Sequence, residues 1–253
     1  MCATPRVGSN FLCHLLLATG RVGNTKEFLC PTQVQSLGGE HCGYANLEEG
    51  ERHLNDYFAT MREVFSKEGV FGAKAHFKQF GWALEHGFDL QRHFPDRFVH
   101  ITRADLIGQA ISYLRASQTQ EWIHDHESRG EPHFDAEALH QAVVELVRSS
   151  QGWESLFQTL GIQPYRLSYE SLCADVPGEL GSLLRFLDID PGTVDLEATV
   201  EDAGRRYKIQ RDELSERWRA GYAEYLRLKA EDQARVMKPD VPAGRPAVPA
   251  SPR

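Results

Sequence analysis

A short loop near the start of the chain carries residue types that suit an anion. The segment TPRVGSNF, residues 4–11, turns at a glycine and a serine and leads into the apolar run FLCHLLLA. A helix that starts after such a turn points several backbone N–H groups and the positive end of its dipole at one place. Arg6 can add a guanidinium fork, and Ser9 and Asn10 can add side-chain donors. The loop therefore suits a phosphate or a sulfate, although a plain turn with a capping serine fits the same residues.

A second polar group follows the clearest strand pattern in the chain, RFVHITR, at residues 97–103. Arg103 ends this pattern, Asp105 is a good N-cap for the helix that should follow, and Ser112 lies two turns into that helix. Ligands of open α/β sheets bind at the carboxyl ends of the strands. Arg103 would therefore meet a second anionic group beside the first loop. The alternative is an Arg–Asp pair that only caps the helix.

A sheet must bring these two groups together, and the spacing of apolar residues predicts one. Strand patterns alternate with helix patterns, which is typical of a mainly parallel sheet with helices on both faces. We expect the chain to form one α/β domain over residues 1–237, followed by a proline-rich disordered tail at 238–253. The predicted strands are 1–4, 69–76, 97–103 and 164–169, the predicted helices are 9–19, 46–66, 105–122, 139–160, 180–187 and 213–236, and the predicted loops are 21–46 and 124–134.

Composition excludes several classes of protein. The 253 residues, 41% of them hydrophobic and 25% charged, are enough for a sizeable globular core. A net charge of -8 argues against a non-specific nucleic-acid binder. The five cysteines include no CxxC pair, and His124 and His126 have no further ligands at useful spacing, so we expect reduced cysteines and no metal. The chain shows no membrane-spanning run and no secretory pattern, which favours a cytoplasmic protein.

Five segments carry a resemblance to a known family. TPRVGSNFLCHLLLATG, GVFGAK, RFVHITRADLIGQAISYLRASQTQEW, YRLSYESL and SERWRAGY together resemble the bacterial trehalose 2-sulfotransferase family, in the same order from Cys2 to Tyr222. The resemblance implies a P-loop-like three-layer α/β fold. It also implies transfer of a sulfuryl group from 3′-phosphoadenylyl sulfate to a hydroxyl of a sugar or glycolipid, without a metal. It suggests a homodimer, which nothing in the residues requires.

The resemblance also implies a donor site in two parts. The loop from Arg6 to Phe11 corresponds to the segment that binds the donor's 5′-phosphosulfate. Arg103 and Ser112 correspond to the residues that bind its 3′-phosphate. The family's loop has a serine at position 7 and a threonine at position 10, where this chain has Val7 and Asn10. The backbone donors survive both changes, and the hydroxyl near the bridging oxygen is lost at residue 10, where the Asn10 amide is an alternative donor. Tyr169 would lie near the adenine, and a basic segment before the last helix would close over the donor. The donor-binding candidates are Arg6, Val7, Gly8, Ser9, Asn10, Phe11, Arg103, Ser112, Tyr169, Lys208, Gln210 and Arg211.

Two residues compete for the role of general base. Glu27, in GNTKEFL, matches the family's proposed catalytic glutamate, and a partly buried carboxylate can have a raised pKa. Lys74 and His76, in AKAHF, resemble the catalytic Lys-x-His of the more distant cytosolic sulfotransferases, and imidazole titrates near neutral pH. Lys74 would contact the transferring sulfuryl group or, alternatively, be a solvated lysine at a strand end. We weigh Glu27 above His76.

Two other functions stay open. One is a nucleotide or small-molecule kinase, although the chain lacks the Gly-x-x-x-x-Gly-Lys-Ser/Thr loop and an acidic magnesium site. The other is a non-catalytic nucleotide-binding protein on the same fold, which the departures at Val7 and Asn10 keep open. Binding of adenosine 3′,5′-bisphosphate but not ATP would separate a sulfotransferase from a kinase.

Overall fold

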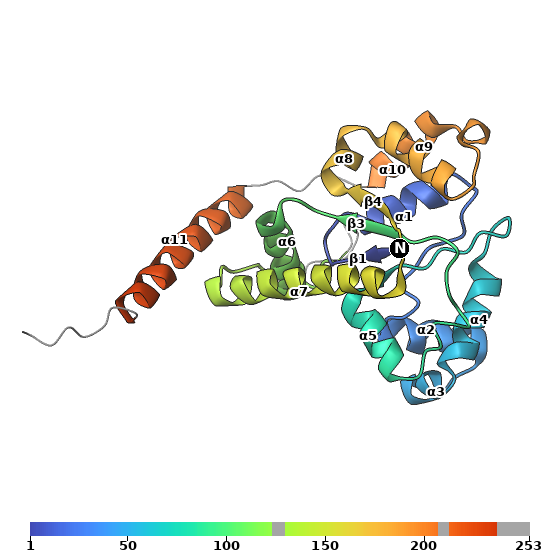
Figure 1. Ribbon diagram of the computed structural model, residues 1–253, viewed down its shortest axis with the longest axis horizontal. Helices are drawn as coiled ribbons and strands as arrows, with labels where there is room; N and C mark the ends of the chain where they lie inside the picture. Colours follow the sequence, from blue (N-terminus) through green and yellow to red (C-terminus); the bar gives the residue numbers. More distant parts are fainter. Residues whose placement is uncertain (123–129, 207–212, 237–253) are drawn as a thin grey trace, which may run out of the picture.

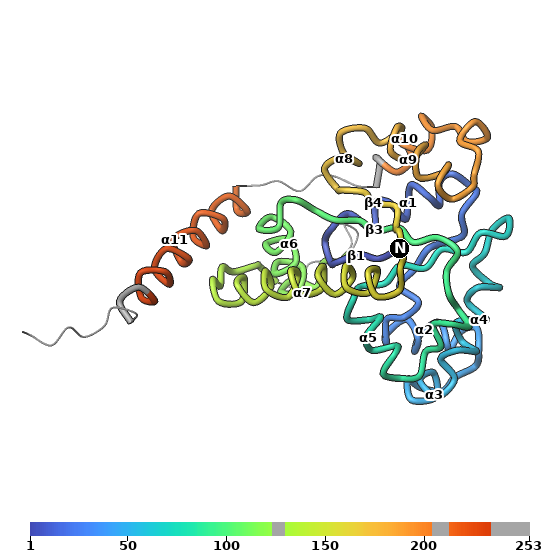
Figure 2. Tube along the Cα trace, viewed as in Figure 1, coloured from blue at the N-terminus to red at the C-terminus, as the bar shows by residue number. Residues whose placement is uncertain are grey.

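Four short parallel strands form the sheet in the described part of the chain. The computed structural model describes residues 1–122, 130–206 and 213–236. The strands β1 (Cys2–Ala3), β2 (Ala75–His76), β3 (Val99–Thr102) and β4 (Tyr165–Ser168) lie in the order β2-β1-β3-β4, and every pair is parallel. The first residues of the chain therefore run through the middle of the fold (Figure 2). This arrangement confirms the predicted parallel α/β fold.

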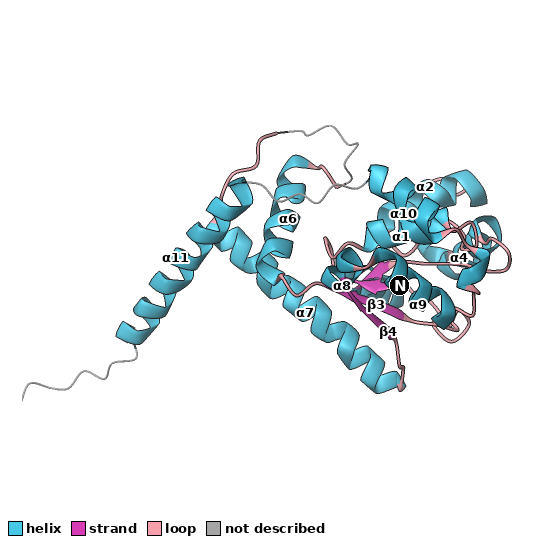
Figure 3. Cartoon of the chain, turned by 90° about the horizontal axis from the view of Figure 1, so that it is seen from above, coloured by secondary structure: helices cyan, strands magenta, loops and turns pink. Residues whose placement is uncertain are grey.

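The alternation of side chains along β1 separates the two faces of the sheet. Ala3 faces a buried cluster with α1 (Ser9–Ala18), α8 (Tyr169–Ala174), α9 (Val176–Phe186) and α10 (Leu196–Arg206). Cys2 faces the other cluster, which contains Trp153 and Phe157 of the long helix α7 (Ala136–Leu160). Figure 3 shows α7 on one side of the sheet and α1 on the other. The fold therefore has three layers, as predicted.

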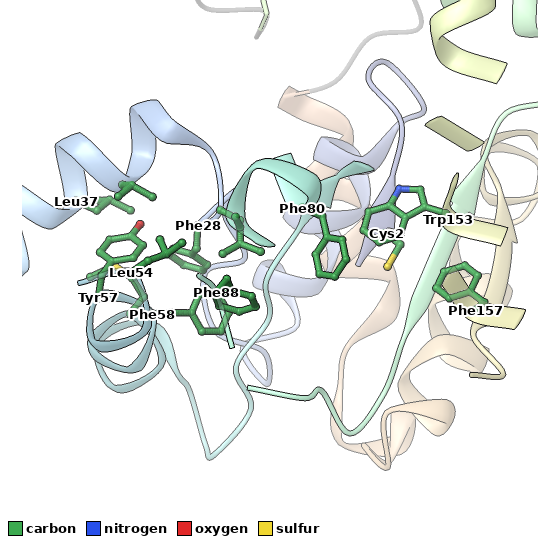
Figure 4. Close-up of a cluster of buried hydrophobic side chains, with 14 residues drawn as sticks. Cys2, Phe28, Leu37, Leu54, Tyr57, Phe58, Phe80, Phe88, Trp153 and Phe157 are labelled. Atoms are coloured by element: carbon green, nitrogen blue, oxygen red, sulfur yellow. The ribbon is translucent and has the colours of Figure 1, made fainter. Parts of the chain in front are cut away.

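The second cluster extends from the sheet into a group of helices at one end of the molecule. It joins α7 to Phe80 of α5 (Phe77–Glu85) and to Tyr57 and Phe58 of α4 (Leu54–Phe65), with Phe28 between them (Figure 4). Phe28 is fully buried and stacks on Phe71, with ring centroids 5.2 Å apart. The residue next to Phe28 in the chain is Glu27, so this packing holds the candidate base in place.

Three predicted elements are wrong. The segment 21–46 is not all loop, because α2 (Pro31–Cys42) begins with a proline in its first turn and buries Val34 and Leu37. Two glycines in the middle of α2 have low helix propensity, which is why the sequence did not predict this helix. Gly38 is needed because a Cβ there would lie 2.9 Å from the Tyr44 ring. The segment 46–66 forms two helices, α3 (Leu47–Arg52) and α4. Only the last two residues of the strand predicted at 69–76 are in the sheet.

Two helices close the other end of the molecule. Asp105 caps α6 (Leu106–Thr119) as predicted, since its side chain accepts the N–H of Gly108 at 3.0 Å. The last described helix, α11 (Glu213–Val236), has the predicted bounds. Its Trp218 and Tyr222 pack against α6 and α7 in a third buried cluster. The distal part of α11 extends away from the sheet (Figure 1).

Candidate active site

A cleft of about 1720 Å³ lies where all four strands end. Its walls include Arg6 after β1, Gln79 after β2, Arg103 after β3 and Tyr169 after β4. The carboxyl edge of a parallel sheet is the expected place for a ligand site. The sheet therefore brings together the two polar groups that lie about 100 residues apart in the sequence.

The loop after β1, residues 6–11, has the backbone conformation expected of an anion-binding loop, and we call it the anion loop. Arg6 and Gly8 have left-handed φ angles of 62° and 84°, and Gly8 is the N-cap of α1. The first hydrogen bond of α1 runs from Leu12 N to Gly8 O at 3.1 Å, and the N–H groups before that bond have no carbonyl partner within the helix. The Tyr169 ring covers Gly8 so closely that a Cβ there would lie 2.4 Å from it. Glycine is thus required both by the backbone and by the neighbouring ring.

The side chains of the loop divide between the cleft and the core. Ser9, Asn10 and Phe11 line the cleft. Val7 is fully buried in the cluster on the α1 face of the sheet, and it does not line the cleft. Any contact that Val7 makes with a ligand must therefore come from its backbone. This placement explains why an apolar residue is compatible with the loop at position 7.

At one end of the cleft, the half-buried Glu27 forms an ion pair with the buried Lys74. The segments that carry them run side by side, because Lys26 and Ala73 form a parallel bridge and Lys74 N donates to Lys26 O at 2.9 Å. Lys74 Nζ lies 2.7 Å from Glu27 Oε1 and also donates to Asn10 Oδ1. Lys74 is only 4% exposed, so the alternative of a solvated lysine is wrong. The ammonium group links the anion loop to the candidate base.

The pKa of Glu27 is lowered, not raised as we expected from partial burial. Burial by itself raises the pKa, but the positive charge of Lys74, the proximity of His76 and hydrogen bonds from Lys74 and Gln79 together outweigh it. Glu27 is therefore ionised at neutral pH in the ligand-free protein. A carboxylate in this state can accept a proton, but its basicity depends on how many of these partners it keeps.

His76 lies close to Glu27 without bonding to it. Its Nδ1 is 3.9 Å from Glu27 Oε2, which is too long for a hydrogen bond. Burial lowers the pKa of His76 to about 4, with Lys74 adding to this effect and Glu27 opposing it. The imidazole is therefore neutral at pH 7. His76 also begins α5, where it forms a capping box with Gln79.

At the other end of the cleft, two arginines and a serine meet. Arg6 Nε donates to Ser112 Oγ at 2.9 Å, and Arg103 Nη1 donates to the carbonyl of Arg6 at 3.3 Å. The Arg103 guanidinium lies over the Tyr169 ring, 5.0 Å from its centroid, and its buried Nε has no hydrogen-bond partner among the described residues. Asp105 is 3.7 Å from Arg103 but 3.0 Å from Arg219. The helix cap Asp105 therefore pairs mainly with Arg219, and the Arg103 guanidinium keeps a donor for a ligand.

Comparison with known protein families identifies the family of this chain. The Stf0 sulphotransferase model matches residues 1–222, which include every strand and both ends of the cleft. The chain belongs to the Stf0 sulphotransferase family. It is 26% identical over 260 residues to the trehalose 2-sulfotransferase of Mycolicibacterium smegmatis (strain ATCC 700084 / mc(2)155) and 30% identical over 259 residues to that of Mycobacterium tuberculosis (strain ATCC 35801 / TMC 107 / Erdman). Each match covers 86% of this chain and 92% of the relative. The protein is a sulfotransferase, and the resemblance found in the sequence is confirmed.

The cleft of this Stf0 sulphotransferase is lined by most of the predicted site residues and by several that were not predicted. Lys208, Gln210 and Arg211 lie outside the described residues, as do His124 and His126. Gln79 and Arg219 line the cleft without having been predicted. Gln79 has the spacing of a capping box, three residues after the N-cap, but histidine is not a usual residue at the N-cap, so the sequence indicated neither the helix start nor the site. Arg219 lies in SERWRAGY, one of the segments that carry the family resemblance, but no role in the site was predicted for it from the sequence.

Further features of the described residues bear on metals, cysteines and membranes. Within the described residues, 1–122, 130–206 and 213–236, no group of three or more His, Cys, Asp or Glu side chains is arranged to hold a metal ion. All five cysteines are free thiols. None of the described helices is long and apolar enough to cross a membrane.

Two changes toward the family's loop, Val7→Ser and Asn10→Thr, are expected to act differently in this Stf0 sulphotransferase. Val7→Ser puts a hydroxyl into an apolar core, so the free energy of unfolding should fall by about 1–3 kcal/mol. Asn10→Thr shortens the side chain that accepts from the buried Lys74 ammonium but keeps an oxygen acceptor there, so the free energy of unfolding should fall by about 0.5–1.5 kcal/mol. Urea unfolding of the two variants and of Val7→Ala measures both effects. Equal stability of Val7→Ser and the wild type would mean that residue 7 faces the cleft.

Proposed function

We propose that this sulfotransferase takes 3′-phosphoadenylyl sulfate as its donor and a hydroxyl of a sugar or glycolipid as its acceptor. The observation that carries the proposal is that a single cleft joins an anion loop with a buried lysine to a pair of arginines at its other end. The proposed donor has anionic groups at both ends, a 5′-phosphosulfate and a 3′-phosphate. The two named relatives, which are trehalose 2-sulfotransferases, support a carbohydrate acceptor.

Donor binding follows from the two ends of the cleft. The helix start at Gly8 and Ser9 would hold the 5′-phosphosulfate through backbone N–H groups, with Lys74 adding a positive charge. Arg103 and Ser112 would hold the 3′-phosphate. The buried Nε of Arg103 has no hydrogen-bond partner among the described residues, so it can donate to a phosphate without breaking a bond to the protein. Tyr169 would support both contacts, because its ring packs against Gly8 and also lies under the Arg103 guanidinium.

Sulfuryl transfer then needs a base and a stabilised leaving group. The acceptor oxygen forms a bond to sulfur, the bond from sulfur to the 5′-phosphate oxygen breaks, and the acceptor's proton passes to the Glu27 carboxylate. Lys74 stabilises the charge that develops on the phosphate. As Lys74 moves its charge toward the donor, Glu27 loses the partner that lowers its pKa most. Donor binding would therefore make Glu27 a stronger base.

His76 is the second candidate for the base. It is neutral at pH 7 and lies on the Glu27 side of the cleft, so it could accept a proton directly. Glu27 is favoured because it alone contacts Lys74, which also reaches the anion loop through Asn10. In this arrangement His76 shapes the pocket around Glu27 and the sulfuryl group.

Ligand-induced thermal stabilisation tests the donor class. At a concentration about 100 times its Kd, a ligand adds about 2.7 kcal/mol to the free energy of unfolding, which corresponds to a rise in Tm of about 5–10 °C for a protein of this size. We expect such a rise with adenosine 3′,5′-bisphosphate and a much smaller one with ATP. A larger rise with ATP would favour a kinase. A rise with the bisphosphate but no transfer to any hydroxyl would favour a non-catalytic nucleotide-binding protein.

A further inference from the structure

Gln79 uses both ends of its side-chain amide at the Glu27 end of the cleft. It lies in the first turn of α5 and lines the cleft. Its Nε2 donates to Glu27 Oε2 at 2.6 Å, and its Oε1 accepts the backbone N–H of His76 at 2.9 Å. The glutamine is therefore tied to the backbone at one end and to the candidate base at the other.

The orientation of this amide is fixed by its partners. A backbone N–H can only donate and an ionised carboxylate can only accept, so the amide of Gln79 cannot be reversed without losing both bonds. The capping box anchors Oε1 at the start of α5, and Nε2 is then directed at Glu27. The helix start thus determines where one oxygen of the Glu27 carboxylate lies.

Lys74 and Gln79 contact different oxygens of the Glu27 carboxylate. Lys74 lies at Oε1 and Gln79 at Oε2, and each oxygen keeps lone pairs for another donor. Lys74 has a second partner in the anion loop, so a bound anion competes with Glu27 for its charge. Gln79 carries no charge and is anchored to the backbone. It is the donor that would stay on Glu27 when Lys74 turns to the ligand.

We propose that Gln79 is a positioning residue that keeps the Glu27 carboxylate aimed into the cleft while Lys74 engages the donor. The proposal rests on the proposed role of Glu27 as general base. The other groups that face Glu27 in the described structure are His76 of β2 and Cys13 of α1. Burial raises the pKa of the Cys13 thiol and lowers that of His76, so both are neutral near pH 7. Gln79 and Lys74 are then the partners that set the state of Glu27.

The variant Gln79→Glu separates positioning from helix capping. Glutamate is an equally good capping-box residue, so it can still accept the N–H of His76. It cannot donate to Glu27, and its negative charge raises the pKa of the neighbouring carboxylate. We expect kcat/KM at pH 7 to fall about 10- to 100-fold, as for a misplaced catalytic group. The acid limb of the pH profile should move toward neutral pH by about one unit or more, with part of the activity returning at higher pH.

Two further variants serve as controls. Gln141→Glu makes the same change on the exposed surface of α7, where Gln141 Nε2 donates to Glu137 at 3.2 Å, and it should change neither kcat/KM nor the pH profile. Gln79→Met removes both hydrogen bonds, so it should lower Tm as well as kcat/KM. If Gln79 only caps α5, Gln79→Met will be less stable, but at a temperature at which it is folded it will keep the wild-type kcat/KM and acid limb. A shift of the limb in Gln79→Glu alone would then report only the added charge.

The variant Glu27→Gln distinguishes a failure of this proposal from a failure of the proposed function. Loss of activity in Glu27→Gln together with a wild-type pH profile in Gln79→Glu would overturn the positioning role and leave the base assignment intact. Full activity in Glu27→Gln would overturn both, because Gln79 would then have no base to position. Loss of activity in Glu27→Gln, together with a shifted limb in Gln79→Met as well as in Gln79→Glu, supports both.

Discussion

Replacing Glu27 with glutamine is expected to slow sulfuryl transfer by about 10²–10⁴-fold, because a general base typically contributes that factor. The amide keeps the shape of the carboxylate but cannot take the acceptor's proton. Affinity for adenosine 3′,5′-bisphosphate should stay near the wild-type value or rise, since Lys74 no longer shares its charge with a carboxylate. Single-turnover transfer with saturating donor measures the chemical step, and calorimetry measures the affinity.

The matched variant for this experiment is His76→Asn. His76 is half-buried close to Lys74 and Glu27, so the two variants disturb the same region. We expect His76→Asn to lose less activity than Glu27→Gln. The opposite order, with Glu27→Gln close to wild type and His76→Asn inactive, would make His76 the base. Because Glu27→Gln removes the partner of a buried ammonium, each variant is assayed at a temperature at which its circular dichroism spectrum shows it to be folded.

Replacing Arg103 with alanine is expected to weaken adenosine 3′,5′-bisphosphate far more than adenosine 5′-monophosphate. A hydrogen bond to a charged group is worth about 1.5–3 kcal/mol, so the bisphosphate should lose about 10- to 150-fold in affinity. The monophosphate lacks the 3′ group that Arg103 would contact. Calorimetry with both ligands gives the two ratios.

The control for this experiment is Arg97→Ala. Arg97 precedes β3, at the opposite end of the strand from Arg103, and pairs on the surface with Asp188 at 2.6 Å. This variant should bind both ligands as the wild type does. If Arg103→Ala weakens the two ligands equally, Arg103 does not hold the 3′-phosphate and acts instead through the loop, whose Arg6 carbonyl it contacts.

Local signals predicted the elements that position the two ends of the cleft. The apolar run after Gly8 and the N-cap at Asp105 each indicate a helix start, and both α1 and α6 begin there. The strand before Arg103 is rich in the β-branched residues Val99, Ile101 and Thr102, a pattern that is easy to recognise as a strand. The parallel sheet followed from the alternation of these patterns with helices.

Contacts that become visible only in the folded chain decided what the sequence could not predict. The helix α2 was not predicted because it contains two glycines, and the reason for Gly38 is close packing against the ring of Tyr44, just after the end of the same helix. The lowered pKa of Glu27 depends on Lys74 and Gln79, which lie 47 and 52 residues away in the chain. Val7 was assigned to the donor site from the family's loop, and only the structure shows that its side chain belongs to the core.

The most direct test of the account follows donor and acceptor together. The protein is incubated with 3′-phosphoadenylyl sulfate and a panel of sugars and glycolipids that includes trehalose, and the products are separated and identified by mass spectrometry. The account predicts equal amounts of adenosine 3′,5′-bisphosphate and a singly sulfated acceptor, and a 10²–10⁴-fold lower rate with Glu27→Gln. It would be contradicted if no acceptor in the panel gained a sulfuryl group while the same protein transferred phosphate from ATP to one of them.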